Sequence, residues 1–77
     1  MKKYDLNTCI QVALDEYFKN LDGQQPNAVY DMVLQSVEKP LLEYIMKHAN
    51  GNQSKAAEIL GVNRNTLRKK LQQYQIQ

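Results

Sequence analysis

The spacing of the apolar residues predicts a series of helices along this chain. Between residues 6 and 21, apolar side chains recur every three or four positions, which places them on one face of an amphipathic helix. The N-cap is expected at Asp5, Asn7 or Thr8, and Asp22-Gly23 should end the helix because glycine tolerates a left-handed conformation. The apolar residues of this face are Leu6, Ile10, Ala13, Leu14, Tyr17, Phe18 and Leu21.

A second, longer helix is expected from an N-cap at Asn27 to about Ala49. Its apolar residues cover more of the circumference than one partner helix would bury, so we expect cover on several sides, in part from a second copy of the chain. Pro40 lacks the amide that would bond to the carbonyl of Ser36, which predicts a kink; the alternative is two helices broken at Lys39-Pro40. The apolar residues are Val29, Met32, Val33, Leu34, Val37, Leu41, Leu42, Tyr44, Ile45, Met46 and Ala49.

Two short helices follow the Asn50-Gly51 stop, over residues 53–60 and 64–74, the second capped by Asn63. They meet the residue requirements of a helix-turn-helix, in which two short helices cross steeply. A small residue is needed at the crossing, and Ala57 fits. Four residues later the chain must reverse without a Cβ clash, and Gly61 fits. The apolar residues expected to pack this pair are Ala56, Leu60, Val62, Leu67 and Leu71.

The outer surface of the last helix carries hydrogen-bonding and cationic side chains and no carboxylate. At about 100° per residue, Leu67, Leu71 and Tyr74 form the inner face. A DNA major groove requires such an outer surface, because arginine or lysine recognises guanine edges, asparagine or glutamine recognises adenine, and cations bind phosphates. A basic face alone would also suit a solvated surface, but the Ala57–Gly61 spacing beside it favours duplex DNA. The outward and flanking residues are Arg64, Asn65, Thr66, Arg68, Lys69, Lys70, Gln72 and Gln73.

Charge and composition narrow the function further. The segment before residue 47 contains four lysines and seven carboxylates, a net charge of −3. The segment from Lys47 onward contains six basic residues and one carboxylate, Glu58, a net charge of +5.

A 77-residue chain buries only about 60% of its unfolded surface, so it needs a disulfide, a metal or association. One cysteine, Cys9, and one histidine, His48, supply neither a disulfide nor a zinc site. Association remains.

Several function classes are excluded. The sequence contains no serine–histidine–acid set, no phosphate-binding glycine loop and no metal cluster, so we expect no enzyme, no cofactor and no small-molecule substrate. No apolar run resembles a signal peptide or a membrane span, so we expect a cytoplasmic protein. Cys9 is interpreted as a buried or half-buried structural thiol and His48 as a cation that offsets the helix polarity. Glu38 and Glu43 are expected to be solvated.

Two stretches resemble the Fis family of bacterial nucleoid-associated proteins. GNQSKAA at 51–57 and LGVNRNTLRKKL at 60–71 are similar to the family's helix-turn-helix, and the similarity extends to the segment 17–24 and to the run VEKPLL at 37–42. The resemblance implies an all-α, four-helix domain over residues 1–77. It also implies dimerisation helices over 5–50, which intertwine in a homodimer, and a helix-turn-helix over 52–74. Such a protein binds and bends DNA, associates with the nucleoid and regulates transcription.

The resemblance implies a DNA-binding role for eight residues. Asn63 and Arg64 would reach base edges, whereas Asn52 and Ser54 would meet the backbone at a helix start, where amides favour an anion. Where the family commonly continues with lysines, this chain has Gln72-Gln73, which predicts weaker contacts to bent DNA and a lower salt dependence. The residues expected to hold phosphates or line the groove are Thr66, Arg68, Lys69 and Lys70.

Two alternatives remain open. The chain could be the C-terminal DNA-binding domain of an enhancer-binding activator, although Met1 and the absence of an ATPase segment favour a freestanding protein. From another class, it could be a helical dimer whose basic helix binds an acidic protein. An acidic partner needs the charge but not the Ala57–Gly61 spacing, so salt-dependent binding to duplex DNA separates the two.

Overall fold

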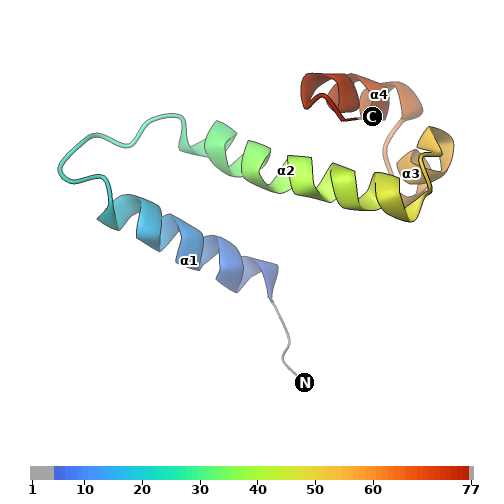
Figure 1. Cartoon of the computed structure of the whole chain (residues 1–77). Coiled ribbons are helices and arrows are strands. Elements are labelled where there is room, and N and C mark those ends of the chain that lie inside the picture. The colour runs from blue at the N-terminus through green and yellow to red at the C-terminus, as the bar shows by residue number, and fades with distance from the viewer. Residues whose placement is uncertain (1–4, 77) are drawn as a thin grey trace.

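The computed structural model describes residues 5–76, in which four α-helices follow one another: α1 (Leu6–Lys19), α2 (Val29–His48), α3 (Gln53–Leu60) and α4 (Arg64–Gln73) (Figure 1). This range contains no strand, so the predicted all-α, four-helix class is confirmed. No helix within it is both long enough and apolar enough to span a bilayer. The two ends of the predicted domain, residues 1–4 and 77, lie outside the described residues.

Helix α1 begins as predicted but ends earlier. The side chain of Asp5 accepts a hydrogen bond from the Asn7 amide at 3.0 Å, so Asp5 is the N-cap. The helix ends at Lys19, before the predicted stop at Asp22-Gly23. Both residues of that stop do adopt positive φ, of 54° and 85°, but they shape the connecting segment after the helix rather than its last turn.

Helix α2 runs unbroken through Pro40, so the single-helix prediction is confirmed. Its predicted N-cap is wrong. The helix starts at Val29, so the N-cap position falls on Ala28 and not on Asn27. Ala28 is in a left-handed conformation with φ 52°, and no side chain caps the helix. The Ser36 hydroxyl donates to the Met32 carbonyl at 2.7 Å, a bond within the helix.

Three helices end in the same hydrogen-bonded motif. After each, a residue adopts positive φ, and the amide that follows it bonds back to a carbonyl in the last turn, as in a Schellman motif. The left-handed residues are Asn50 after α2, Gly61 after α3 and Gln75 after α4. The bonds are Gly51 N to Met46 O at 2.9 Å, Val62 N to Ala57 O at 3.0 Å and Ile76 N to Leu71 O at 2.8 Å.

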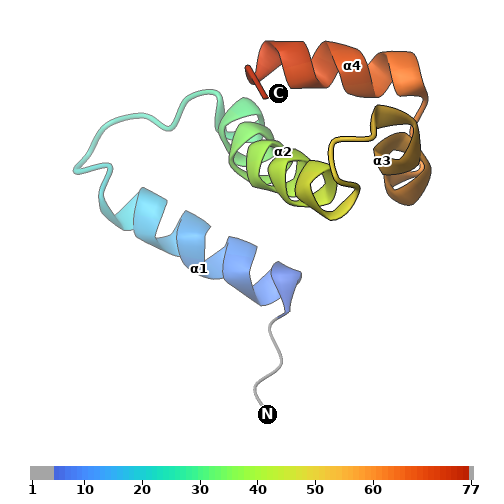
Figure 2. The same ribbon diagram turned by 45° about the vertical axis from the view of Figure 1, so that its right-hand side comes forward.

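The hydrophobic core lies where α2, α3 and α4 meet (Figure 2). Two adjacent alanines of α3, Ala56 and Ala57, are buried there, and their small side chains let the other two helices approach closely. Helix α1 contributes no buried residue. The buried residues of the core are Leu42, Met46, Ala49, Ala56, Ala57, Leu67 and Leu71.

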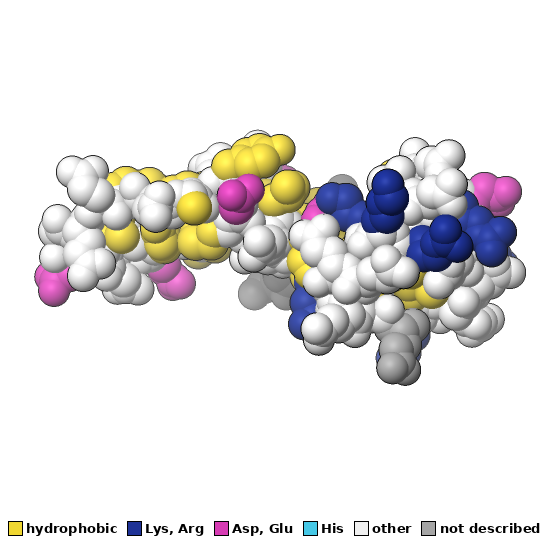
Figure 3. Space-filling view, turned by 90° about the horizontal axis from the view of Figure 1, so that it is seen from above, with side chains coloured by type: hydrophobic (Ala, Val, Ile, Leu, Met, Phe, Trp, Pro, Cys, Tyr) yellow, Lys and Arg dark blue, Asp and Glu magenta, His cyan; other side chains and the backbone are white. Residues whose placement is uncertain are grey.

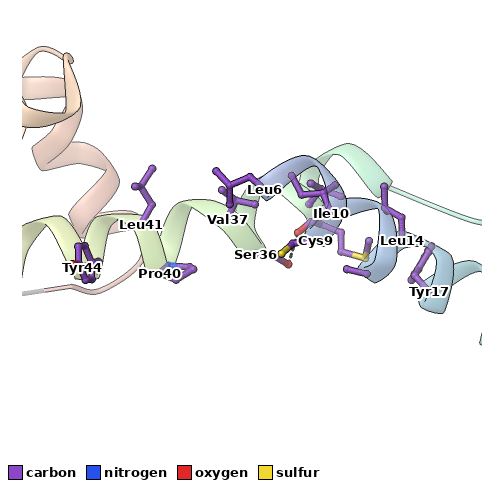
Figure 4. Close-up of a pocket in the computed structure, with 13 residues that line it drawn as sticks. Leu6, Cys9, Ile10, Leu14, Tyr17, Ser36, Val37, Pro40, Leu41 and Tyr44 are labelled. Carbon is purple, nitrogen blue, oxygen red and sulfur yellow. Dashed lines mark hydrogen bonds between the residues drawn. The ribbon is translucent and has the colours of Figure 1, made fainter. Parts of the chain in front are cut away.

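Helix α1 faces α2 across an apolar hollow of about 700 Å³ (Figure 4). Cys9 lines this hollow and is exposed, so the predicted burial of its thiol is wrong for the single chain. Val37 and Leu41 of α2 point into the same hollow and remain 39% and 44% exposed. Helix α2 is therefore apolar on two sides, one packed against α3 and α4 and the other directed toward α1. The main lining residues are Leu6, Ile10, Leu14, Tyr17, Val33, Val37, Leu41 and Tyr44.

Candidate nucleic-acid interface

Helices α3 and α4 form the predicted helix-turn-helix, and the turn depends on one backbone conformation. Gly61 has φ +74°, a region that side-chain-bearing residues adopt only at a cost. A Cβ placed there would meet no atom within 4 Å. The predicted reason for this glycine, avoidance of a Cβ clash, is therefore wrong, and its positive φ is the reason instead.

The inner face of α4 packs as the helical spacing predicts. Leu67 is 1% exposed, Leu71 is buried, and Tyr74 is partly buried at the edge of the core. Val62 was expected to pack here too, but its side chain is 43% exposed. Ile76, which the sequence left unassigned, packs against the core because the Schellman motif after α4 turns it inward.

Two asparagines begin the two helices and bring their side chains to the interface. The Oδ1 atom of Asn52 accepts from the Lys55 amide at 3.1 Å, and that of Asn63 accepts from the Asn65 amide at 2.7 Å. Capping occupies only the oxygen of each carboxamide, while the Nδ2 group remains a donor suited to phosphates or base acceptors. Both residues are exposed, so the cap orients a side chain that still faces solvent.

The helix-turn-helix carries a concentration of cationic side chains (Figure 3), and three of the four cations of α4 are exposed. Arg64, Arg68 and Lys69 are exposed, as are the hydroxyl-bearing Ser54 and Thr66. In the space-filling view, the dark blue side chains gather over the helix-turn-helix, whereas the α1–α2 part shows an apolar strip. The structure thus brings seven of the eight predicted site residues to one accessible end of the molecule: Asn52, Ser54, Asn63, Arg64, Thr66, Arg68 and Lys69.

The position of Arg64 carries information about the ligand. It is the first residue of α4, and the first turns of α3 and α4 contain no acidic residue. A cation at the positive end of a helix costs stability, typically about 0.3–1 kcal/mol, so helix formation does not explain Arg64. An anion bound at that end would be stabilised by both the helix amides and the guanidinium.

Lys70, the eighth predicted residue, is placed differently. Its Nζ lies 2.8 Å from a carboxylate oxygen of Glu38 on α2, and the two side chains are 36% and 20% exposed. The Tyr74 hydroxyl donates to the other oxygen of the same carboxylate. The predicted solvation of Glu38 is therefore wrong, because the fold brings two donors of α4 onto it.

The protonation of this cluster reflects its hydrogen bonds. The bond from Lys70, and then that from Tyr74, lower the pKa of Glu38 below its usual value. The same bond to Glu38 raises the pKa of Tyr74 to about 12. The sequence offers no signal for this cluster, since Glu38 and Tyr74 lie 36 residues apart and no local spacing pairs them.

Metal binding has no support in the described part of the chain, where no three potential ligands cluster. His48 lies in the last turn of α2, as predicted, and its ring stacks on that of Tyr44 with centroids 6.4 Å apart.

Comparison with known proteins gives consistent matches. Residues 33–74 match the profile of a family described as "Bacterial regulatory protein, Fis family". A protein of Ralstonia nicotianae is 57% identical over 74 residues, which cover 96% of each chain. A Neisseria meningitidis protein is 59% identical over 70 residues, or 91% of this chain and 89% of its own. One from Pseudomonas aeruginosa is 55% identical over 71 residues, or 92% of this chain and 68% of its own. All three carry names that describe Fis-like DNA-binding proteins.

Proposed function

The chain belongs to the Fis family of bacterial regulatory proteins, and we propose that it binds duplex DNA through α3 and α4 as a homodimer. The observation that carries the proposal is the outward face of α4, which is cationic, free of carboxylates and headed by Arg64 at the positive end of the helix. The names of the relatives, which describe DNA binding, support the same partner.

In this proposal α4 enters the major groove with its N-terminal end leading. Arg64 and the Nδ2 group of Asn63 reach base edges, where arginine and asparagine recognise guanine and adenine respectively. Arg68, Lys69 and Thr66 contact phosphates along the groove. The start of α3 faces the adjacent backbone. There Asn52, Ser54 and the first-turn amides that the Asn52 cap does not use offer donors to a phosphate, because amides of a first turn have no helical partners.

The homodimer is supported by the apolar faces that the single chain leaves uncovered. Helix α1 buries no residue against the rest of the chain, and its apolar face and that of α2 line a hollow open to solvent. A domain of this size is marginal as a monomer, so a second copy that inserts its own helices into the hollow would supply the missing core. Helices α1 and α2, residues 5–50, are thus proposed as the dimerisation unit.

Two recognition helices related by a two-fold axis would contact two half-sites of one duplex. Few residues per subunit reach base edges, so sequence preference is expected to be loose, and DNA shape and deformability should contribute to site choice. We propose on this basis that the protein bends DNA and acts as a nucleoid-associated regulator of transcription.

The test is binding to random-sequence and selected duplexes across a salt series. We compare the wild type with Arg64→Ala and Lys69→Ala, and with Lys19→Ala, which removes the same charge from an exposed position on α1. Arg64→Ala should reduce the preference for selected sequences, because it removes a base contact. Lys69→Ala should weaken all sequences alike and reduce the slope of log affinity against log salt by about 0.9. Lys19→Ala should bind like the wild type.

Two outcomes would contradict the proposal. If Lys19→Ala weakens DNA binding as much as Lys69→Ala, DNA is attracted by the net charge of the protein and not by the cations of α4. If none of the proteins binds duplex DNA in a salt-dependent way, the basic helix serves another partner, such as an acidic protein.

A further inference from the structure

The recognition helix is attached to α2 at both of its ends. Helix α4 runs back over α2 in the opposite chain direction (Figures 1 and 2). Near its start, Leu67 is buried in the core beside the Gly61 turn. At its far end, Lys70 and Tyr74 reach Glu38 near the middle of α2. Leu71 is buried in the last turn of α4 and Ile76 packs against the core just after it, so the Glu38 contacts add directional polar restraints to an end that apolar packing also holds.

The Glu38 cluster is built from matching helical spacings. Glu38 precedes the core residue Leu42 by one turn, so it lies on the face of α2 that packs against α3 and α4. Lys70 and Tyr74 are likewise one turn apart on α4, and each bonds a different oxygen of the carboxylate. Charge-assisted bonds to both oxygens fix the direction of α4 more firmly than one exposed ion pair would.

We propose that Glu38, Lys70 and Tyr74 form a clamp that sets the angle of α4 against α2, and that Lys70 is therefore a positioning residue and not a phosphate ligand. The proposal rests on the proposed function, because this angle matters for DNA only if α4 enters the groove. In a homodimer joined through α1 and α2, the tilt of each α4 determines the distance between the two recognition helices. A rigid tilt selects one spacing of half-sites, whereas a loose tilt accepts several.

The clamp also lowers the contribution of Lys70 to electrostatic binding. A lysine whose ammonium is paired with a partly sheltered carboxylate releases few counterions when DNA binds nearby. Lys70→Gln should therefore leave the slope of log affinity against log salt nearly unchanged, whereas Lys69→Gln should lower it by about 0.9.

Tyr74→Phe is the central test because it removes one clamp bond without changing any charge or any group that could touch phosphate. Its matched control is Tyr30→Phe, in which the hydroxyl of a largely exposed tyrosine on α2 is removed. Each protein selects bound duplexes from a random library, and the pool is sequenced for the distance between half-sites. Tyr74→Phe should broaden this distribution and weaken binding to the duplex preferred by the wild type severalfold, with an unchanged salt slope. Tyr30→Phe should match the wild type.

A charge swap gives an independent measurement. Glu38→Lys and Lys70→Glu should each weaken binding to the preferred duplex by roughly tenfold, and the double variant should recover most of the loss, because the pair is restored with its polarity reversed. For Glu38→Lys, the two roles of Lys70 predict opposite changes in DNA affinity. If Lys70 were a phosphate ligand, removing its competing carboxylate and adding a cation would tighten binding.

The outcomes separate the clamp from the proposed function. If the wild type binds DNA and Arg64→Ala weakens it, but Tyr74→Phe lowers only the melting temperature and leaves the spacing distribution unchanged, the clamp is merely structural and the inference is overturned. Failure of the double variant to recover, in protein that circular dichroism shows to be folded, overturns it as well. If the wild type itself shows no salt-dependent binding to duplex DNA, the proposed function fails first.

Discussion

At the scale of single residues, the chain uses left-handed backbone positions that differ in their cost. Equivalent positions after three helices are occupied by Asn50, Gly61 and Gln75, and Ala28 adopts the same conformation before α2. Glycine adopts it freely, asparagine at some cost, and alanine or glutamine at about 1–2 kcal/mol. Local strain is therefore concentrated at Ala28 and Gln75, away from the turn of the helix-turn-helix.

Substitution at these positions should change stability in opposite directions. Gly61→Ala should lower the free energy of unfolding by about 1 kcal/mol, and Ala28→Gly should raise it by a smaller amount, since glycine also adds entropy to the unfolded chain. Urea unfolding followed by circular dichroism measures both. A loss well above about 3 kcal/mol for Gly61→Ala would point to a clash, which the open space around this residue does not predict.

The Glu38 cluster predicts a dependence of stability on pH at both extremes. The pKa of Tyr74 is raised from 10.0 to about 12, so its contribution is complete below pH 10 and is lost as the pH rises through about 12. The pKa of Glu38 is lowered, so its contribution is present above its ordinary value of 4.5 and is lost as the pH falls below that value toward the lowered pKa.

Unfolding of the wild type and Tyr74→Phe should therefore be compared at pH 9 and at about pH 12. The difference in unfolding free energy between the two proteins should shrink at the higher pH, because the ionised phenolate no longer donates to Glu38. The other tyrosines and the lysines titrate in both proteins, so their effects cancel when the two unfolding free energies are subtracted. A difference that stays constant between the two values would contradict the hydrogen bond.

At the scale of elements, α4 ends with less positive charge than it starts with. Arg64, Arg68 and Lys69 are exposed over its first two turns, whereas Gln72 and Gln73 are neutral and exposed at its end. Since Lys70 is paired with Glu38, the C-terminal part of the helix offers little free charge to DNA beyond the central contacts. Flanking DNA should thus be held weakly.

Lysines at these two positions should strengthen DNA binding. Gln72→Lys with Gln73→Lys should tighten binding to long duplexes and steepen the slope of log affinity against log salt by up to about 0.9 per new phosphate contact. The matched control adds the same charge at Gln24 and Gln25, which are exposed in the segment between α1 and α2. Equal tightening in the control would show that net charge is responsible, whereas no change in either protein would show that flanking DNA does not reach this end of α4.

At the scale of the whole molecule, α2 has two apolar sides with different surroundings. One side packs Leu42, Met46 and Ala49 against the helix-turn-helix, and this core is complete within one chain. The other side, with Val37 and Leu41, faces the hollow beside α1 and stays partly exposed. In the proposed homodimer, any change in how the two copies pack on one side of α2 would therefore be passed to the helix-turn-helix through a single helix.

A carboxylate placed in the hollow should prevent association and leave the fold of the helix-turn-helix intact. Leu41→Glu should shift the protein from dimer to monomer in sedimentation measurements and weaken DNA binding more than tenfold, because a monomer contacts one half-site. Val12→Glu is the control, since Val12 is exposed on α1 and does not line the hollow. A wild type that sediments as a monomer, or an unchanged Leu41→Glu, would contradict the homodimer.

The sequence by itself determined the features that depend on near neighbours. Helical spacing determined α3 and α4, the capping chemistry of Asn63 determined where α4 begins, and a run of cations without carboxylates determined the outer face of α4. Only the tertiary structure decided which side of α2 is covered and that Lys70 meets Glu38 and not solvent. These depend on how helices from distant parts of the chain pack, and many packings share the same local pattern of apolar and polar residues.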